Sequence, residues 1–295
     1  MLDHKDERGN MKEKKSSYFW DVLNRFFNHK LAVIGLLILL IEIVTIIFLP
    51  IIMHLDPYSS EHLFGAAPGN GLILGSDDTG RDLFARLVYG GRTSLYVGLL
   101  AVIVSAAIGI PLGMIAGYYR GVAEMIIMRV ADIFMAFPSM ILIMVLVSVI
   151  GPSVQSVTVI IGIMGWPQFA RLLYGNVLSV REKDYVEAAR AVGTKNGMIM
   201  LRYILPNASA PVLVAFTFNM ANAILQESAL SFLGMGVQPP QASWGNILYA
   251  AQSVSIIATR PWMWVPAGIC LLVTILSINV FGDGLRDALD PRMKI

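Results

Sequence analysis

Long apolar runs constrain this chain more than any other feature of its sequence. The first, LAVIGLLILLIEIVTIIFLPIIM, carries a single charged side chain, Glu42. Runs of about 18 or more such residues are typical of membrane helices, because a hydrocarbon core about 30 Å thick requires about 20 residues of helix. The composition agrees, with 56% hydrophobic and only 14% charged residues. We therefore expect an all-α integral membrane protein with six transmembrane helices near residues 31–53, 93–118, 123–151, 154–175, 208–234 and 261–282.

The residues before the first run divide into two parts. Residues 1–15 are charged and poor in apolar side chains, which predicts a disordered tail. Residues 16–30 favour an interfacial helix in the headgroup region, and the alternative is a plain extension of the first span. The first span is too long for a signal peptide and lacks a small-residue cleavage site, so we expect a retained anchor. The apolar residues of the expected interfacial helix are Phe19, Trp20, Leu23, Phe26 and Phe27.

Lysine and arginine are distributed unevenly between the two sides of the predicted spans. With the N-terminus inside, eighteen of the 22 basic residues fall in inner segments. An excess of basic residues marks cytoplasmic loops. We therefore expect both termini and the loop of residues 176–207 to be cytoplasmic, and residues 54–92 to be an extracytoplasmic loop.

The second span carries small residues every four positions, which gives one smooth helix face. Such faces let helix backbones approach closely inside a membrane. Close packing and a sliding surface during gating both remain open as explanations. Pro111 and Pro167 are expected to bend their helices, since each removes one backbone hydrogen bond. The small residues are Ala101, Ser105, Gly109, Gly113 and Gly117.

The outer stretch LGSDDTGRDLFARLVYGGRTSL predicts a separate amphipathic helix before the second span. Asp78 or Thr79 could cap its start, and Gly90 with Gly91 could end it. The helix could act as an outer gate or a docking surface, and a plain interfacial helix is the alternative. Its expected apolar face consists of Leu83, Phe84, Leu87 and Val88.

Motifs of catalysis are missing from the sequence. It contains no G-x-x-x-x-G-K-[ST] phosphate loop, no H-E-x-x-H pair and no nucleophile elbow. The stretch GSDDTGRD resembles a calcium loop only superficially, because Val88 stands where a bidentate glutamate is needed. The single cysteine, Cys270, lies in an apolar run and suits packing. We expect no enzyme, no metal site and no bound cofactor, and the absence of a basic and aromatic cluster argues against nucleic-acid binding.

Polar residues inside the spans are few. Asn219, Asn222 and Gln226 share one face of the fifth span, and Glu227 follows them. These four residues predict a water-accessible pathway between helices, with interhelical hydrogen bonding as the alternative. A proton relay would need more ionisable groups in series. The sequence assigns no role to Glu42.

A charged segment, EAARAVGTKNGMIMLRYILP, interrupts the apolar pattern between the fourth and fifth spans. It predicts two short helices separated by Gly193, which can adopt the left-handed conformation that ends a helix. Thr194 is the expected cap of the second helix, and Pro206 the expected stop. Small residues exposed on the first helix suit insertion into a cleft on another protein. We expect Tyr185, Ala188, Ala189 and Val192 on that face.

The same segment matches the pattern E-A-A, three residues, G, and a spacer ending in hydrophobic-Pro. It resembles the cytoplasmic loop of the membrane subunits of bacterial ATP-binding-cassette importers. Four further stretches make the chain similar to the C-type permease subunit of dipeptide, oligopeptide and nickel importers, from about residue 18 onward. They are LGSDDTGRDLFARLVYGGRTSL, GYYRGVAEMIIMRVADIFMAFPSMIL, ESALSFLGMGVQPPQASWGNIL and FGDGLRDALDPRMK.

This resemblance implies a type I importer permease fold, with a core domain over residues 93–295, in the bacterial cytoplasmic membrane. It implies a second related permease as partner, two cytoplasmic ATPase subunits that hold ATP and magnesium, and an extracytoplasmic binding protein. The first arm of the loop would be the coupling helix that contacts an ATPase subunit. The residues assigned to that contact by resemblance are Tyr185, Glu187, Ala188, Ala189, Arg190 and Gly193.

The resemblance favours short peptides as the transported solute, with nickel or a metal chelate as the alternative. An ion-coupled secondary transporter would show broken helices in inverted halves and a chain of buried charges. A membrane scaffold without transport activity would not need an ordered arm with a glycine hinge. The sequence does not specify the length or charge of the peptide.

Overall fold

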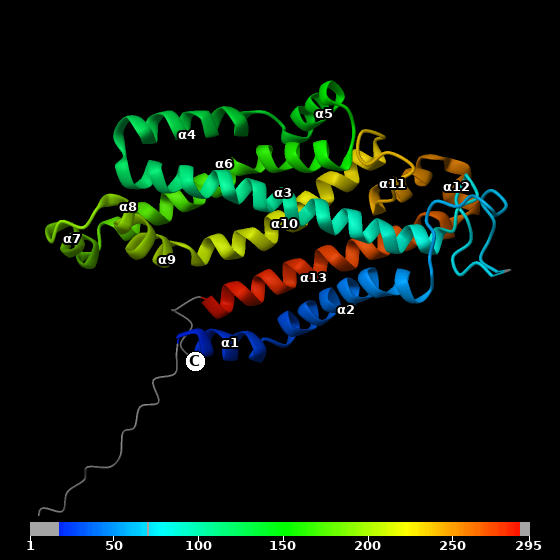
Figure 1. The fold of residues 1–295 in the computed structure, drawn as a ribbon, viewed down its shortest axis with the longest axis horizontal. Coiled ribbons are helices and arrows are strands. Elements are labelled where there is room, and N and C mark those ends of the chain that lie inside the picture. Colours follow the sequence, from blue (N-terminus) through cyan, green and yellow to red (C-terminus); the bar gives the residue numbers. More distant parts are fainter. Residues whose placement is uncertain (1–17, 70, 290–295) are drawn as a thin grey trace, which may run out of the picture.

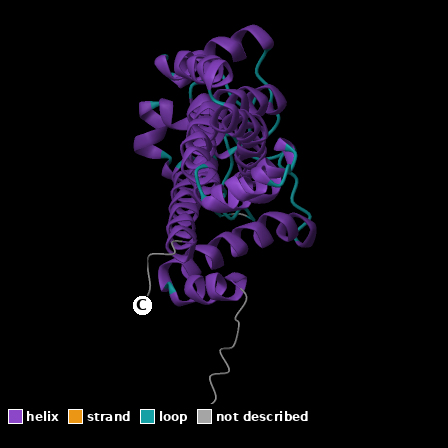
Figure 2. Ribbon diagram, turned by 90° about the vertical axis from the view of Figure 1, so that its left-hand side faces the viewer, coloured by secondary structure: helices purple, strands orange, loops and turns teal. Residues whose placement is uncertain are grey.

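Long helices run side by side along the longest axis of the molecule (Figure 1). The computed structural model describes residues 18–69 and 71–289, so the expected tail of residues 1–15 lies outside the described residues. Within the described part the chain consists of helices and loops without strands (Figure 2). The long helices are α1 (Tyr18–Asn28), α2 (Lys30–Ile52), α3 (Leu83–Tyr119), α4 (Gly121–Ala136), α5 (Ser139–Ile150), α6 (Val154–Arg181), α10 (Ala210–Phe232) and α13 (Val265–Leu289).

Shorter helices connect them at the two ends of the molecule. One end carries α7 (Asp184–Ala191), α8 (Asn196–Met198), a π-helix (Ile199–Ile204) and α9 (Leu205–Ala208). The other carries α11 (Trp244–Leu248), a 3₁₀ turn (Tyr249–Gln252), α12 (Val254–Thr259) and a second 3₁₀ turn (Pro261–Met263). Figure 1 shows α7 and α12 at opposite ends.

Helices α2, α3, α6 and α13 are each long and apolar enough to cross a membrane. Two bent pairs bring the described helices to six candidate spans, α4 with α5 and residues 196–208 with α10. This agrees with the expected all-α membrane protein. Helices α4 and α5 lie on one side of α3 and α6, and α2 and α13 lie on the other side (Figure 1).

Helix α3 is continuous, and the expectation of a separate amphipathic helix before the second span is wrong. Its N-cap is Asp82, not Asp78 or Thr79: the carboxylate accepts the Phe84 N–H at 2.8 Å. Gly90 and Gly91 lie inside α3 rather than at a helix end. A Cβ added to Gly91 would stand 2.6 Å from Cδ1 of Ile46, so these glycines permit close packing instead of ending a helix.

The third expected span, residues 123–151, is broken into α4 and α5, which meet at an angle of 87°. Phe137 has an extended backbone, with ψ 146°, and Pro138 follows it. A residue before proline is forced out of the helical region, because the proline ring clashes with its backbone. The apolar run predicted one continuous helix, whereas the structure divides it at Phe137 and Pro138.

Pro206 does not stop the chain's second short helix, as the sequence suggested. It lies inside α9, and the sharp bend of 65° comes later, between Ala208 and α10. The π-helix immediately before Pro206 is wider than an α-helix, and the Leu205 N–H bonds to the Met200 carbonyl. A π turn relocates the hydrogen bonds that a proline ring would otherwise disrupt.

The small face of α3 meets α6. A Cβ at Gly109 would lie 2.5 Å from the Trp166 carbonyl oxygen, and one at Gly113 would lie 2.4 Å from that of Ala170. At Gly117 it would lie 2.7 Å from Val177. Both helices continue through their internal prolines, Pro111 and Pro167. The close approach makes α3 and α6 a tightly packed pair at the centre of the bundle.

Helix α2 is attached to α3 through an arginine that the sequence left unassigned. Pro50 lacks an N–H, so the Ile46 carbonyl has no helical donor. Arg92 of α3 supplies one, because its Nε donates to the Ile46 oxygen at 2.8 Å and its Nη2 to the Ile47 oxygen at 2.9 Å.

Helix α1 packs against α13 and the start of α2. The Phe26 ring is buried and meets the Phe281 ring of α13 edge-on at 5.5 Å, whereas Trp20 and Phe27 are exposed. Its bounds, Tyr18–Asn28, fall within the expected interfacial segment.

Candidate functional site

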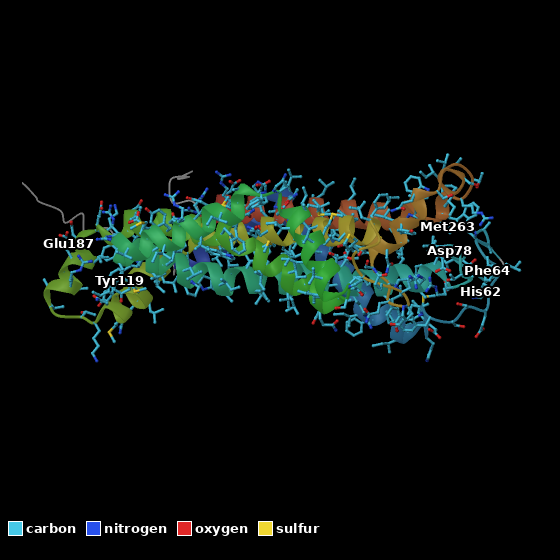
Figure 3. The ribbon with its side chains drawn as sticks, turned by 90° about the horizontal axis from the view of Figure 1, so that it is seen from above. His62, Phe64, Asp78, Tyr119, Glu187 and Met263 are labelled. Atoms are coloured by element: carbon cyan, nitrogen blue, oxygen red, sulfur yellow. The ribbon has the colours of Figure 1, made fainter. Side chains whose placement is uncertain are left out.

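Helix α7 stands at the extreme end of the molecule. Figure 3 places Glu187 and Tyr119 at this end, and His62, Phe64, Asp78 and Met263 at the other. Helix α7 packs on α6 and on the π-helix (Ile199–Ile204). The segment singled out in the sequence thus projects beyond the long helices.

Two apolar side chains hold α7 on the bundle. Val186 and Ala189 are buried in a cluster that includes Phe169 and Leu173 of α6 and Ile204 of the π-helix. Ala189 is only 6% exposed, so its expected place on the outward face is corrected: it faces the protein's own core. The exposed surface of α7 and its end consists of Asp184, Tyr185, Glu187, Ala188, Arg190, Ala191 and Val192.

Gly193 ends α7 in a left-handed conformation, with φ +80°, which confirms the expected conformation. The Gly193 N–H bonds to the Arg190 carbonyl and the Thr194 N–H to the Ala189 carbonyl. This pair of bonds is the Schellman motif, which satisfies carbonyls at a helix end. The expected role of Thr194 as a cap is wrong, because its amide closes α7 and Lys195 precedes α8.

The end of α3 is joined to the arm formed by residues 184–208, which contains α7, α8, the π-helix and α9, by residues that the sequence analysis missed. The Tyr118 hydroxyl donates to Oδ1 of Asn196 at 2.8 Å, and the Arg190 guanidinium lies 5.9 Å from the centre of the Tyr118 ring. Arg181 donates to the Tyr118 carbonyl at 2.9 Å. No local sequence pattern marked Tyr118 as a contact residue, because its hydrogen-bond partners lie on α6 and α8.

A cavity of about 230 Å³ lies among α3, α5, α6 and α10. It contains the predicted stripe, since Asn219, Asn222 and Gln226 all line it. The fold adds polar groups from three other helices. They are Ser105 of α3, Ser139 of α5 and Gln168 of α6.

The carboxamides around this cavity differ in their hydrogen bonds. Asn219 Nδ2 donates to the Ala215 carbonyl at 2.8 Å, within its own helix. In the described part of the chain, Gln168, Asn222 and Gln226 make no side-chain hydrogen bond with the protein. Their donors and acceptors are therefore available to a molecule that enters the cavity.

Glu227 does not line that cavity, which corrects its expected place beside the stripe. Its side chain is 0% exposed and does not belong to the cavity lining. Ser94 of α3 donates to Oε2 at 3.0 Å, and Ser231 donates to Oε1 at 2.7 Å. The network continues into the segment before α11, where the Val237 N–H bonds to Ser231 and the Trp244 N–H to Ser94.

The loop before α3 is organised around Asp77. Its Oδ2 lies 2.7 Å from Arg81 Nε and 3.3 Å from Nε of the buried Arg86. Burial alone would raise the pKa of Asp77, but hydrogen bonds from Arg81 and Thr79 outweigh it and lower the pKa below its ordinary value of 3.8. Arg86 also donates to the Pro57 and Pro240 carbonyls, so this group ties the loop to α3.

Glu42 of α2 finds one partner in the membrane-spanning region. The Thr274 hydroxyl of α13 lies 3.0 Å from both of its carboxylate oxygens.

Among residues 18–69 and 71–289, no three His, Cys, Asp or Glu side chains converge in a way that could hold a metal ion.

Two family models match the chain. Residues 109–295 match the model described as binding-protein-dependent transport system inner membrane component. Residues 17–68 match the N-terminal TM domain of oligopeptide transport permease C.

Curated relatives are similar over most of their length. The dipeptide transport system permease protein DppC of Alkalihalophilus pseudofirmus is 42% identical over 90% of this chain and 87% of the relative. The oligopeptide transport system permease protein OppC of Bacillus subtilis is 37% identical over 95% of this chain and 92% of the relative. The glutathione transport system permease protein GsiD of Pectobacterium atrosepticum is 39% identical over 94% and 91%, respectively.

Solved structures share the fold. A chain of the MetNI methionine ABC transporter, in inward-facing conformations, superposes with a TM-score of 0.58 at 20% identity, over 70% of this chain and 97% of that chain. A chain of an amino acid ABC transporter crystallised with histidines gives a TM-score of 0.53 at 15% identity, over 69% and 94%. At these identities the likeness concerns the fold alone.

Proposed function

The chain belongs to the binding-protein-dependent transport system inner membrane component family, and we propose that it carries short peptides across the bacterial inner membrane. It is the non-catalytic permease of an ATP-binding-cassette importer and spans the membrane several times. Relatives named for dipeptide, oligopeptide and glutathione transport support the peptide assignment over the nickel alternative.

The observation that carries the coupling role is the geometry of α7. Val186 and Ala189 anchor the helix, while Tyr185, Glu187 and Ala188 stay exposed at the end of the molecule. We propose that this face docks on a cytoplasmic ATPase subunit, which would bind ATP and magnesium. The exposed Arg190 belongs to the same contact, whereas Ala189 supports it from behind.

The arm is built to transmit a displacement rather than absorb it. The apolar anchor joins α7 to α6, and the Tyr118 to Asn196 hydrogen bond joins the following turn to α3. Helix α3 has 37 residues, so it extends about 55 Å at 1.5 Å per residue. A movement of α7 would therefore reach the opposite end through two tightly packed helices.

The remaining partners follow from the same architecture. We propose that a second, related permease completes the pathway, that a second ATPase subunit docks beneath it, and that an extracytoplasmic binding protein delivers peptide at the end that carries Asp78 and Met263. The excess of basic residues on the α7 side supports cytoplasmic termini. Asn219, Asn222 and Gln226 would line the pathway.

Uptake in a strain lacking this subunit tests the function. A labelled dipeptide, a labelled pentapeptide and radioactive nickel are offered in parallel, with and without the gene restored. We expect peptide uptake alone to fall and to return with the gene. Loss of nickel uptake alone would show that the substrate is nickel rather than peptide, and the assignment as an importer permease would stand.

Gly193 tests the coupling role. Gly193→Val would force a β-branched residue into φ +80°, and because no atom of the described chain lies within 4 Å of the new Cβ, the expected effect within this subunit is backbone strain. We expect normal membrane insertion and uptake reduced at least about tenfold, since strain of roughly 1–2 kcal/mol would rearrange the end of α7.

The matched control is Gly197→Val, four residues further along the same arm. Gly197 also has no atom within 4 Å of an added Cβ, but it has an ordinary helical backbone. We expect this variant to keep most of the uptake. Equal uptake by the Gly193 variant and the wild type would rule out α7 as the coupling helix.

A further inference from the structure

The cavity among α3, α5, α6 and α10 has an unusual chemical uniformity. Its polar lining consists of four carboxamides, Gln168, Asn219, Asn222 and Gln226, and two hydroxyls, Ser105 and Ser139. The lining residues include no Asp, Glu, Lys, Arg or His. Positive and negative groups are equally excluded, so the cavity offers hydrogen bonds without charge.

Three of these carboxamides have no hydrogen-bond partner within residues 18–69 and 71–289. Gln168 and Asn222 are exposed to the cavity side, and Gln226 is half-buried. A polar amide inside a membrane protein is stable only where water, protein or a solute satisfies its hydrogen bonds. These side chains are therefore accessible and free to bond a polar solute that enters the cavity.

A carboxamide presents the same pair of groups as a peptide unit, a carbonyl acceptor and an N–H donor. One Asn or Gln can pair with one peptide unit through two hydrogen bonds. A ring of such groups from α6 and α10 therefore suits an extended main chain, whatever its side chains are. It suits isolated charges poorly, because nothing in the lining compensates them.

The nearest carboxylate in the sequence does not alter this chemistry. Glu227 follows Gln226 directly, but it is wholly buried and not part of the lining, and its oxygens accept hydrogen bonds from Ser94 and Ser231. The only acidic side chain of α10 (Ala210–Phe232) is therefore engaged by serines and does not enter the cavity.

We propose that this cavity binds the main-chain amides of the transported peptide. It does not discriminate between peptides by their side chains or termini. This inference rests on the proposed function, since it assigns the chemistry of the same pathway. Gln168 thereby becomes a specificity-determining residue together with Asn222 and Gln226. Discrimination between peptides by charge or length would belong to other parts of the importer.

The test uses the complete importer with its binding protein in proteoliposomes. A labelled tripeptide is compared with the matching depsipeptide, in which an ester oxygen replaces one main-chain N–H. Both are supplied at concentrations that saturate the binding protein. We expect the ester to enter about three- to tenfold more slowly, the effect of losing one hydrogen bond.

Variants of the lining sharpen the comparison. Asn222→Leu and Gln226→Leu are expected to slow the tripeptide to the rate of the ester, so that the ratio of the two rates approaches one. Asn176→Leu is the matched control, because the Asn176 amide on α6 lies outside the cavity and donates to the Leu172 carbonyl. It is expected to keep the wild-type ratio.

A charge placed in the lining gives a second readout. Asn222→Asp is expected to slow an acidic tripeptide about threefold or more relative to a basic one, whereas the wild type carries both at similar rates. Equal wild-type rates for amide and ester, or a wild-type preference for one charge, would overturn the inference alone. Wild-type proteoliposomes that take up neither peptide nor ester would overturn the proposed function.

Discussion

Helix α10 carries two groups of polar side chains that are neighbours in sequence and opposite in environment. Glu227 is wholly buried and bonded to serines of α3 and α10. Gln226 and Asn222 face a cavity and have no partner among the described residues. One side of the helix uses polarity to hold the fold together, and the other leaves polarity available for a solute.

The difference shows that a polar residue in a membrane helix is not by itself a functional site. Such residues are costly in hydrocarbon, so each must be satisfied by protein, water or ligand. Which of these applies decides the role. Paired groups should govern stability, whereas unpaired groups should govern transport.

The largest effect is expected at Glu227. Glu227→Leu would leave the Ser94 and Ser231 hydroxyls buried without their acceptor, at a cost of about 1–3 kcal/mol for each group. Thermal unfolding of the purified complex in detergent measures the loss. Glu227→Gln keeps an acceptor of the same shape and should retain most of the stability. Wild-type stability in the Leu variant would show that the network does not hold α3, α10 and the segment before α11 together.

An intermediate effect is expected at Asp77, which is paired but lies outside the membrane-spanning helices. Its folded-state pKa is depressed, so its contribution is present above the unfolded-state value near 3.8 and is lost as pH falls through the folded-state pKa. Asp77→Asn should cost about 1–2 kcal/mol at neutral pH, because the hydrogen bonds lose their charge.

The pH dependence distinguishes this charge from other acidic groups. Unfolding midpoints of wild type and Asp77→Asn should differ at pH 7 and converge below pH ~4. A constant difference over this range would mean that the Asp77 charge does not contribute.

The smallest effect on stability is expected at Asn222. Asn222→Leu removes no protein hydrogen bond, so the unfolding midpoint should stay near that of the wild type, within about 0.5 kcal/mol or slightly above. The same thermal measurement checks it. A loss comparable to that of Glu227→Leu would place Asn222 among the structural groups and remove the contrast between the two sides of α10.

The sequence by itself determined the features that depend on local pattern. Apolar runs identified the membrane helices, four-residue spacing marked the face of α3 that meets α6, and Gly193 marked the end of α7. It also grouped Asn219, Asn222 and Gln226, because residues three, four and seven apart share a helix face. These features need no knowledge of which helices pack together.

Only the tertiary structure decided how these pieces meet. Local patterns misplaced the start of α3, because Gly90 and Gly91 are used for contact with α2 and α11 rather than for a turn. Ala189 reads as part of an outward small face, yet α6 and the π-helix cover it.

Glu227 gives the clearest case of a role that local sequence cannot assign. Its partner Ser94 lies 133 residues away in the chain. Gln168 likewise lies on α6, whereas the polar stripe that lines the same cavity lies on α10. Spacing along one helix tells which side chains share a face but not what that face meets. The partner is fixed by the packing of distant helices, and in a membrane the partner determines whether a polar group stabilises the protein or remains free to bind a solute.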